Sequence, residues 1–198
     1  MINIVIVNGF PRSGKTLFTN NCIKELKEYG FTISTIDFVK HIARKCGWDG
    51  EKTPRNRKFL SDLKRLLVDW GDVPYRKVEE AIDYIHQISI QYNVASENFF
   101  LFVDSREPEE IKRFKEEYGA ITVLIDRDEV KTKQSNDSDN NVENFEYDYI
   151  IKNNGSLKEF QDASLEFLNT IKNKTKEEKQ PADIYGVMKG ETNEFNNK

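Results

Sequence analysis

The sequence predicts an α/β fold of three layers, in which helices cover both faces of a mainly parallel five-stranded sheet. Apolar, strand-like segments alternate along the chain with amphipathic, helix-like segments. Residues 99–103 (FFLFV) form a continuous apolar run, which is typical of a strand buried on both faces of a parallel sheet. A glycine-rich loop, residues 9–16, follows the first apolar segment.

The loop at residues 9–16 reads GFPRSGKT and has the spacing G-x-x-x-x-G-K-[ST] of a phosphate-binding loop. An apolar strand, residues 1–7, leads into it, and helical apolar spacing over residues 15–29 leads out of it. This strand, loop and helix context is the one that the motif requires. The fold class is therefore that of a P-loop NTPase.

The residue types of the loop suit a nucleotide triphosphate. Gly9 and Gly14 can adopt positive φ, so that successive backbone N–H groups turn inward onto phosphate oxygens. Lys15 would lie between the β- and γ-phosphates, and Thr16 would bind Mg²⁺. A turn that only caps a helix has no need of these last two residues. The residues expected to bind ATP are Gly9, Arg12, Ser13, Gly14, Lys15, Thr16 and Leu17.

The amino-acid composition and charge indicate which classes of binding partner are favoured. The net charge is −4 and the pI is near 5.4, which argues against a general nucleic-acid binder or a binder of anionic membranes and favours a small-molecule partner. Cys22 and Cys46 belong to no paired motif, so we expect a reducing compartment and no structural zinc. No apolar run approaches the roughly 18 residues of a membrane span, and no signal peptide is recognisable. We expect a cytoplasmic protein, and we leave open whether it forms a homodimer.

Predicted strands and helices alternate along the first half of the chain, as an α/β fold requires. Residues 15–29 carry an apolar stripe, and Gly30 is expected to end that helix. Residues 31–36 alternate and are rich in β-branched side chains, which indicates a strand. Three helices are then expected, at residues 37–46, 54–70 and 75–92. Because they separate two strands, we expect a helical acceptor-binding insertion over about residues 38–97.

The second half is predicted in the same way. Residues 108–118 have acid and proline in their first turn, as a helix start does, and residues 120–125 read as a strand. A fifth strand is expected at residues 147–151. The final helix carries the stripe Leu157, Phe160, Ser164, Phe167 and Ile171.

Two segments are too polar to form a core of their own. Residues 126–147 have the length of a lid over an active site, although their composition is also that of a disordered loop. Residues 174–198 form a polar tail that we expect to be loosely attached. The kinase-like domain is therefore expected to span residues 1–173.

Charged side chains follow the predicted strands, and in a parallel sheet ligands collect at the carboxyl ends of strands. Asp104 is placed as an acid that holds Mg²⁺, together with Thr16, or orients the attacking oxygen; the alternative is a carboxylate that caps the next helix. Arg106 and Arg127 would stabilise the charge of a migrating phosphoryl group, so the expected catalytic residues are Lys15, Asp104, Arg106 and Arg127.

A kinase also needs a second anion site for its acceptor. The segment after the second strand supplies the candidates Asp37, Lys40, Arg44 and Arg57. Guanidinium groups can bind a phosphate through two parallel hydrogen bonds. The alternative is that these charges are only a solvated helix face.

These motifs together resemble the deoxynucleoside monophosphate kinases of phage type, and animal phosphomevalonate kinases are similar in pattern. The resemblance covers about residues 2–171, with the P-loop as its one sharp motif. Its weaker parts are Asp104-Ser105-Arg106 followed by Glu110, Ile111 and Phe114, the strand that leads to Arg127, Asp148-x-Ile-Ile-x-Asn-x-Gly-Ser-Leu, and Trp48-Asp49-Gly50-x-Lys52 with Arg57.

The resemblance implies transfer of the γ-phosphoryl group of ATP to a nucleoside 5′-monophosphate, with Mg²⁺, under a mobile lid. By the same resemblance, Asp104 and Arg106 would serve the reacting phosphates, and Lys40 and Arg57 would bind the acceptor. The chain departs from the pattern in its lid, where Arg127 is the only arginine.

Two other functions stay open at this point. A kinase of another small metabolite would use the same ATP site, because acceptor specificity depends on a few pocket contacts. A non-catalytic nucleotide-binding module or switch GTPase is the third possibility. It is disfavoured because the chain has no Asn-Lys-x-Asp motif and no Asp-x-x-Gly after residues 99–103.

Overall fold

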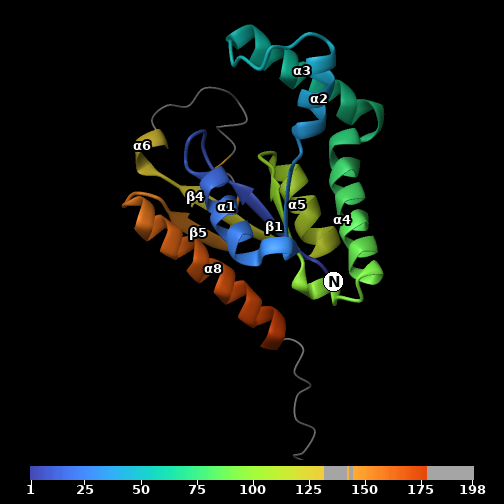
Figure 1. The fold of residues 1–198 in the computed structure, drawn as a ribbon. Coiled ribbons are helices and arrows are strands. Elements are labelled where there is room, and N and C mark those ends of the chain that lie inside the picture. Colours follow the sequence, from blue (N-terminus) through green and yellow to red (C-terminus); the bar gives the residue numbers. More distant parts are fainter. Residues whose placement is uncertain (132–141, 143–144, 178–198) are drawn as a thin grey trace, which may run out of the picture.

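The computed structural model describes residues 1–131, 142 and 145–177, and these form a three-layer α/β fold (Figure 1). Its sheet has five strands in the order β2-β3-β1-β4-β5, and every neighbouring pair is parallel. The expected five-stranded sheet is confirmed. The strands are β1 Asn3–Asn8, β2 Gly30–Ser34, β3 Phe100–Asp104, β4 Ile121–Asp126 and β5 Tyr149–Lys152.

The register brings the carboxyl ends of the inner strands together. Val7 of β1 pairs with Asp104 of β3, and Ser34 of β2 pairs with the same aspartate. On the other side of β1, Asn8 pairs with Leu124 of β4. The phosphate loop therefore leaves the sheet between the ends of β3 and β4.

The helices follow the predicted alternation with small shifts of their ends. The described helices are α1 Lys15–Leu26, η1 Lys27–Tyr29, α2 Asp37–Lys45, α3 Pro54–Gly71, α4 Val73–Gln91, η2 Ser96–Asn98, α5 Pro108–Tyr118, α6 Asp128–Lys131 and α8 Leu157–Glu177. The centre of the predicted lid, residues 132–141 and 143–144, and most of the predicted tail, residues 178–198, lie outside the described residues. Residues 174–177, which were expected to belong to the tail, continue α8.

Two apolar cores lie on the two faces of the sheet. Val5 and Val7 of β1 face the core that contains α1 and α8, whereas Ile4 and Ile6 face the core that contains α4 and α5. This alternation follows from the two-residue period of a strand. Burying one such side chain contributes about 1.5–3 kcal/mol, so the two cores together fix the helices on the sheet.

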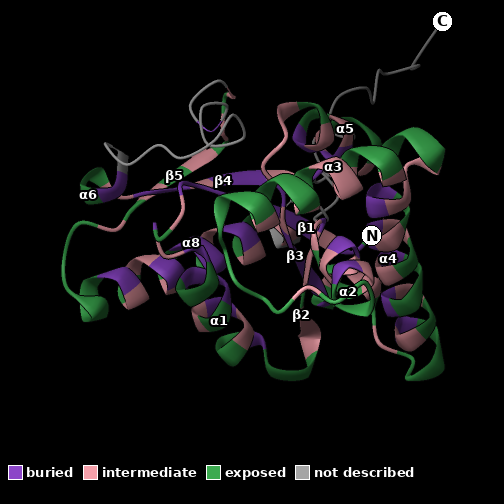
Figure 2. Ribbon diagram, turned by 90° about the horizontal axis from the view of Figure 1, so that it is seen from above, coloured by how far each residue is buried: buried purple, intermediate pink, exposed green. Residues whose placement is uncertain are grey.

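Helices α2 and α3 extend away from the sheet (Figure 1). Thr53 caps α3 by accepting a hydrogen bond from the backbone N of Asn56, as the sequence predicts. None of the residues of α3 is buried (Figure 2). Trp70 is 82% exposed. Helix α4, in contrast, buries Tyr75, Val78, Ile82, Ile85 and Ser89, and most of these side chains belong to the main core. The segment expected as an insertion thus includes one helix of the central domain.

Two expectations from the sequence are corrected by the structure. The helical segment ends at Gly30, but α1 stops at Leu26, the turn Lys27–Tyr29 is a 3₁₀ helix, and its C-cap Gly30 has φ −105° and begins β2 instead of adopting a left-handed conformation. A Cβ at Gly30 would lie 3.1 Å from the Cα atom of Ile23, so the glycine permits close packing of helix on strand. Leu157, expected on the buried stripe of α8, is 76% exposed because it lies at the first position of the helix.

Candidate active site

The phosphate loop is folded on itself by its own backbone and by side chains. The N–H of Gly9 donates to Oδ1 of Asn8 over 2.7 Å, and Nζ of Lys15 donates to the carbonyls of Gly9 and Phe10 over 2.7 and 3.2 Å. Lys15 is only 9% exposed, so the loop wraps around its ammonium group. The buried lysine gives the concave side of the loop a positive charge.

Both glycines of the motif are required by the backbone and by close neighbours. Gly9 has φ +149°, and a Cβ there would lie 2.5 Å from the carbonyl oxygen of Ile125. Gly14 has φ +107°, and a Cβ there would lie 2.4 Å from Nδ2 of Asn153. No L side chain fits either position without moving the backbone.

The other predicted ATP-binding residues lie in the same turn. Arg12 adopts a left-handed conformation, with φ 68°, and Ser13 is buried. Oγ of Ser13 has no hydrogen-bond partner within the described part of the chain. Thr16 and Leu17 are exposed in the first turn of α1, so both can reach a ligand bound on the loop.

Described residues near the two ends of the predicted lid contact the loop. Val130 and Val142 pack with Phe10 of the loop in a small buried cluster. The hydroxyl of Tyr147 accepts a hydrogen bond from Nδ2 of Asn8 over 2.7 Å and donates to the carbonyl of Val142 over 2.9 Å. Burial raises the pKa of Tyr147 to about 12, so its hydroxyl stays a donor at neutral pH.

A cavity of about 310 Å³ lies beside the loop, between the ends of β2 and β3 and the helices α2 and α3. Four predicted site residues line it, namely Lys40, Arg57, Asp104 and Arg106. Pro11 of the phosphate loop forms part of its wall. The rule on strand ends and the resemblance predict that these residues share one site, and the structure brings them into one cavity.

The cavity is strongly basic. Its charged lining residues are Lys40, Lys52, Arg57, Lys64 and Arg106 against Asp104 and Glu107. Lys52 and Lys64 are not among the site residues predicted from the sequence, although Lys64 lies on the same helical face as Arg57. An excess of positive charge in a partly enclosed space favours an anionic ligand.

Two hydrogen bonds orient the basic side chains of this cavity. Nε of Arg57 donates to the carbonyl of Lys52 over 3.2 Å, which fixes the plane of the guanidinium group. Nζ of Lys40 lies 3.3 Å from Oδ1 of Asp37, and the other oxygen of that carboxylate accepts from the N–H of Ser34. Asp37 therefore holds Lys40, and it is not itself among the residues that line the cavity.

Asp104 is the predicted acid of the site, and it lines the cavity together with Glu107. Asp104 as a whole is half-buried at the end of β3, but its Oδ1 atom is fully buried. This oxygen has no hydrogen-bond partner among the described residues. A carboxylate oxygen in this position needs a cation or a donor from a ligand. The residues present thus fit Mg²⁺, which would be held by Asp104 and the hydroxyl of Thr16 with phosphate oxygens and water.

Two predicted residues lie elsewhere. The guanidinium of Arg44 stacks over Trp48, 5.5 Å from the ring centre, and is not among the residues that line the cavity. Arg127 follows β4, and its Nη2 atom lies 2.6 Å from a carboxylate oxygen of Glu129. It lies at the start of the predicted lid, so its catalytic role stays a prediction.

Asn153 is a site residue that the sequence analysis did not select. Its Nδ2 atom donates to the carbonyl of Ser13 over 2.7 Å, and its backbone N–H donates to the carbonyl of Asp126 over 2.7 Å. The residue therefore links the segment after β5 to both β4 and the phosphate loop. The only sequence signal was its place in the run that resembles phage-type kinases.

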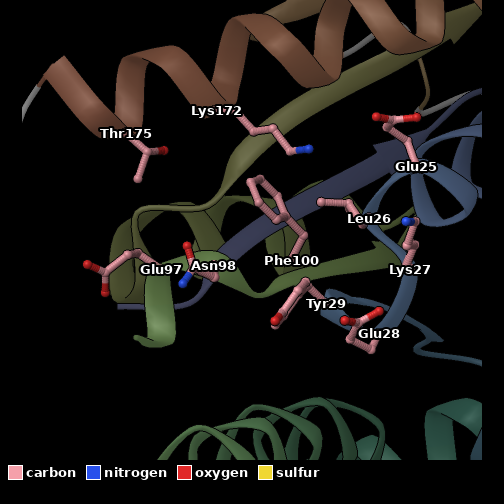
Figure 3. A pocket seen from close by; sticks show the side chains of 10 residues that line it. All are labelled: Glu25, Leu26, Lys27, Glu28, Tyr29, Glu97, Asn98, Phe100, Lys172 and Thr175. Carbon is pink, nitrogen blue, oxygen red and sulfur yellow. The ribbon is translucent and has the colours of Figure 1, made fainter. Parts of the chain in front are cut away.

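A larger hollow of about 760 Å³ lies at the amino ends of β2 and β3, away from the phosphate loop (Figure 3). Phe100 and Tyr29 lie in its wall, together with acidic and basic side chains such as Glu97 and Lys172. It contains none of the predicted site residues. Of these two hollows, only the smaller cavity contains residues predicted to belong to the site.

Comparisons with known proteins agree with this architecture. The dephospho-CoA kinase from Campylobacter jejuni is similar to the chain at a TM-score of 0.51 and 15% identity, over 88% of this chain and 100% of that one. The chain has the fold of a P-loop kinase. Shikimate kinase from Aquifex aeolicus is similar at a TM-score of 0.46 and 12% identity, over 87% of this chain and 98% of that one. A gluconokinase from Sinorhizobium meliloti is similar at a TM-score of 0.46 and 12% identity, over 90% of this chain and 98% of that one.

At these identities the likeness shows the fold alone. No protein-family model and no curated protein sequence matches the chain. No helix in the described part of the chain is long and apolar enough to cross a membrane.

Proposed function

We propose that this protein is an ATP-dependent phosphotransferase that acts on a small anionic acceptor. The observation that carries the proposal is the basic cavity that shares Pro11 with the phosphate loop and contains Asp104 and Arg106. A phosphate loop alone serves many nucleotide-binding proteins, whereas a second anion site beside it is what a kinase needs.

In this proposal the phosphate loop binds the β- and γ-phosphates of ATP. Lys15 and Arg106 stabilise the charge that spreads over the equatorial oxygens of the migrating phosphoryl group. Asp104 orients the attacking oxygen or, together with Thr16, holds Mg²⁺. The metal, when bound, neutralises charge on the phosphates.

The acceptor that we propose is a nucleoside or deoxynucleoside 5′-monophosphate. Lys40, Lys52 and Arg57 offer three positive charges on the side of the cavity opposite the sheet, and the hydrogen bond from Nε of Arg57 to the carbonyl of Lys52 holds the guanidinium group beside the cavity. A guanidinium group is suited to bind a phosphate. The volume of about 310 Å³ lies at the lower end of the range for small-molecule sites. The resemblance of the motifs to phage-type kinases favours the same class of acceptor.

A coupled assay of ADP release tests both levels of this proposal. A panel of nucleoside and deoxynucleoside monophosphates is compared with other phosphorylated and hydroxylated metabolites, each against the ATPase background. Turnover with monophosphates supports the full proposal. Turnover with another acceptor alone supports the kinase function and contradicts a nucleotide as the acceptor. Nucleotide binding without transfer to any acceptor would leave a binding module.

A further inference from the structure

We propose that Glu110 is a positioning residue that holds both walls of the acceptor cavity in place. The inference rests on the proposed kinase function and assigns a role to a carboxylate that does not itself line the cavity. Glu110 lies in the first turn of α5, and the two walls are formed by α3 and by the loop after β3.

The two oxygens of Glu110 bind different elements. Oε1 lies 2.8 Å from Nζ of Lys64, which belongs to α3 and lines the cavity. Oε2 accepts a hydrogen bond of 2.8 Å from the hydroxyl of Ser105. Ser105 lies between Asp104 and Arg106 in the chain, and both of those residues line the cavity from the opposite side. One carboxylate therefore connects a basic residue of the acceptor wall to the catalytic strand end.

The surroundings of this connection differ from those of the surface ion pairs. The side chains of Lys64 and Glu110 are 17% and 16% exposed, and Ser105 is 1% exposed. In the pair of Lys58 with Asp62, on the same helix α3, the side chains are 76% and 43% exposed. A largely dehydrated pair of charges is held more firmly than a solvated one, because water does not compete for its hydrogen bonds.

The consequence for an acceptor is geometric. A lysine side chain is long and flexible, and its ammonium group has three N–H donors. Glu110 takes one donor of Lys64 and fixes the position of the group. The remaining donors stay available to an anion in the cavity. Through Ser105, the same carboxylate keeps Asp104 and Arg106 at a constant distance from that anion.

The test compares Glu110→Gln with Glu109→Gln. Glutamine keeps an oxygen that can accept from Ser105 but removes the negative charge that fixes Lys64, whereas Glu109 is exposed in the same turn. We expect Glu110→Gln to raise the KM for the acceptor about tenfold or more and to leave the KM for ATP within about twofold of the wild type. Glu109→Gln should leave both values unchanged.

A double-mutant cycle with Lys64→Met separates positioning from general destabilisation. If Glu110 acts through Lys64, Glu110→Gln should cause little further change in a Lys64→Met background. Additive effects of the two substitutions, or equal losses in the KM for ATP and for the acceptor, would overturn the proposal. Melting temperatures of all variants show whether a loss follows unfolding.

Binding of inorganic pyrophosphate, followed by calorimetry with the phosphate loop already filled by a non-hydrolysable ATP analogue, gives a readout that does not depend on turnover. We expect Lys64→Met and Glu110→Gln to weaken pyrophosphate binding in a non-additive way. If the wild type transfers phosphate but Glu110→Gln behaves as Glu109→Gln in both assays, the positioning role is wrong and the kinase function stands. If the wild type phosphorylates nothing, the kinase function fails and the pyrophosphate cycle alone decides the role of Glu110.

Discussion

The side-chain amide of Asn153 donates a hydrogen bond of 2.7 Å to the backbone carbonyl of Ser13, across 140 positions of sequence. The contact joins the segment after the last strand to the turn of the phosphate loop. Gly14, the next residue in the loop, has φ +107°, and a Cβ there would lie 2.4 Å from the same amide, so a side chain at this position would strain the backbone and displace Asn153. The shape of the loop thus depends on a residue outside the motif.

Asn153→Ala should weaken ATP binding without abolishing it. The substitution removes one hydrogen bond, worth about 0.5–1.5 kcal/mol, from the turn that has to receive the phosphates. We expect the Kd for ATP, measured by calorimetry, to rise between about twofold and tenfold. Asn154→Ala is the matched control, because the side chain of Asn154 binds Asp128 instead of the loop. Equal effects of the two substitutions would contradict the assignment.

Lys15→Met should remove phosphoryl transfer almost completely. Nζ of Lys15 lies inside the loop, at the carbonyls of Gly9 and Phe10, where its charge can stabilise the migrating group. The loss of one such donor costs about 10²–10³ in kcat. The assay is ADP release in the presence of the acceptor. Lys24→Met, an exposed change on the same helix, should retain wild-type activity; near-normal turnover in Lys15→Met would remove the loop from the mechanism.

Arg57→Ala should act on the acceptor rather than on ATP. Its guanidinium lines the basic cavity and is oriented by the carbonyl of Lys52, so its loss removes a charged hydrogen-bond donor from the acceptor site. We expect the KM for the acceptor to rise at least about tenfold, with a small change in the KM for ATP. Arg55→Ala, two positions earlier on the exposed start of α3, is the control. A rise in the KM for ATP of the same size would mean that Arg57 serves the other substrate.

Asp148→Asn should lower stability in a pH-dependent manner. Its carboxylate accepts hydrogen bonds from Nζ of Lys115 at 2.5 Å and from the N–H and hydroxyl of Thr122 at 2.9 and 2.8 Å. Burial opposes ionisation, but these bonds outweigh burial and hold the pKa of Asp148 below its usual value of 3.8. The stabilisation is therefore complete above the unfolded-state pKa and is lost as the pH falls through the folded-state pKa.

Thermal unfolding of the Asp148→Asn variant at several pH values measures this effect. At pH 7 we expect Tm to fall by about 2–4 °C, which corresponds to roughly 1 kcal/mol in a domain of this size. The difference from the wild type should shrink below about pH 4. Asp162→Asn, which alters an exposed pair with Lys158, should change Tm little at any pH. A difference that persists unchanged at low pH would show that charge is not the cause.

Short-range patterns in the sequence account for most of the architecture. The spacing of Gly9, Gly14 and Lys15, the apolar run of residues 99–103 and the stripes of the helices are local, and each was enough to place an element. Asp104 could be expected at the site because its strand is central and parallel, and the carboxyl ends of such strands meet at one edge.

Where local patterns are ambiguous, they predict only part of the structure. A glycine after a helical stripe is typical both of a helix end and of a close approach between elements, and Gly30 has both roles. Leu157 shares the spacing of a buried stripe, but it lies at the first position of its helix. The spacing of apolar residues predicts which side chains share a helix face, but it does not predict whether another part of the protein packs against that face.

The sequence by itself determined the phosphate loop, the alternation of strands and helices, and the candidates at the strand ends. Only the tertiary structure decided which candidates share a cavity: Lys40, Arg57, Asp104 and Arg106 do, together with Lys52 and Lys64, whereas Arg44 stacks on Trp48. It also revealed the links from Asn153 to Ser13 and from Glu110 to Lys64. The physical reason is that these contacts join residues far apart in the chain, whose separation is set by the packing of α3, α5 and β5 around the sheet and not by any local preference of the backbone.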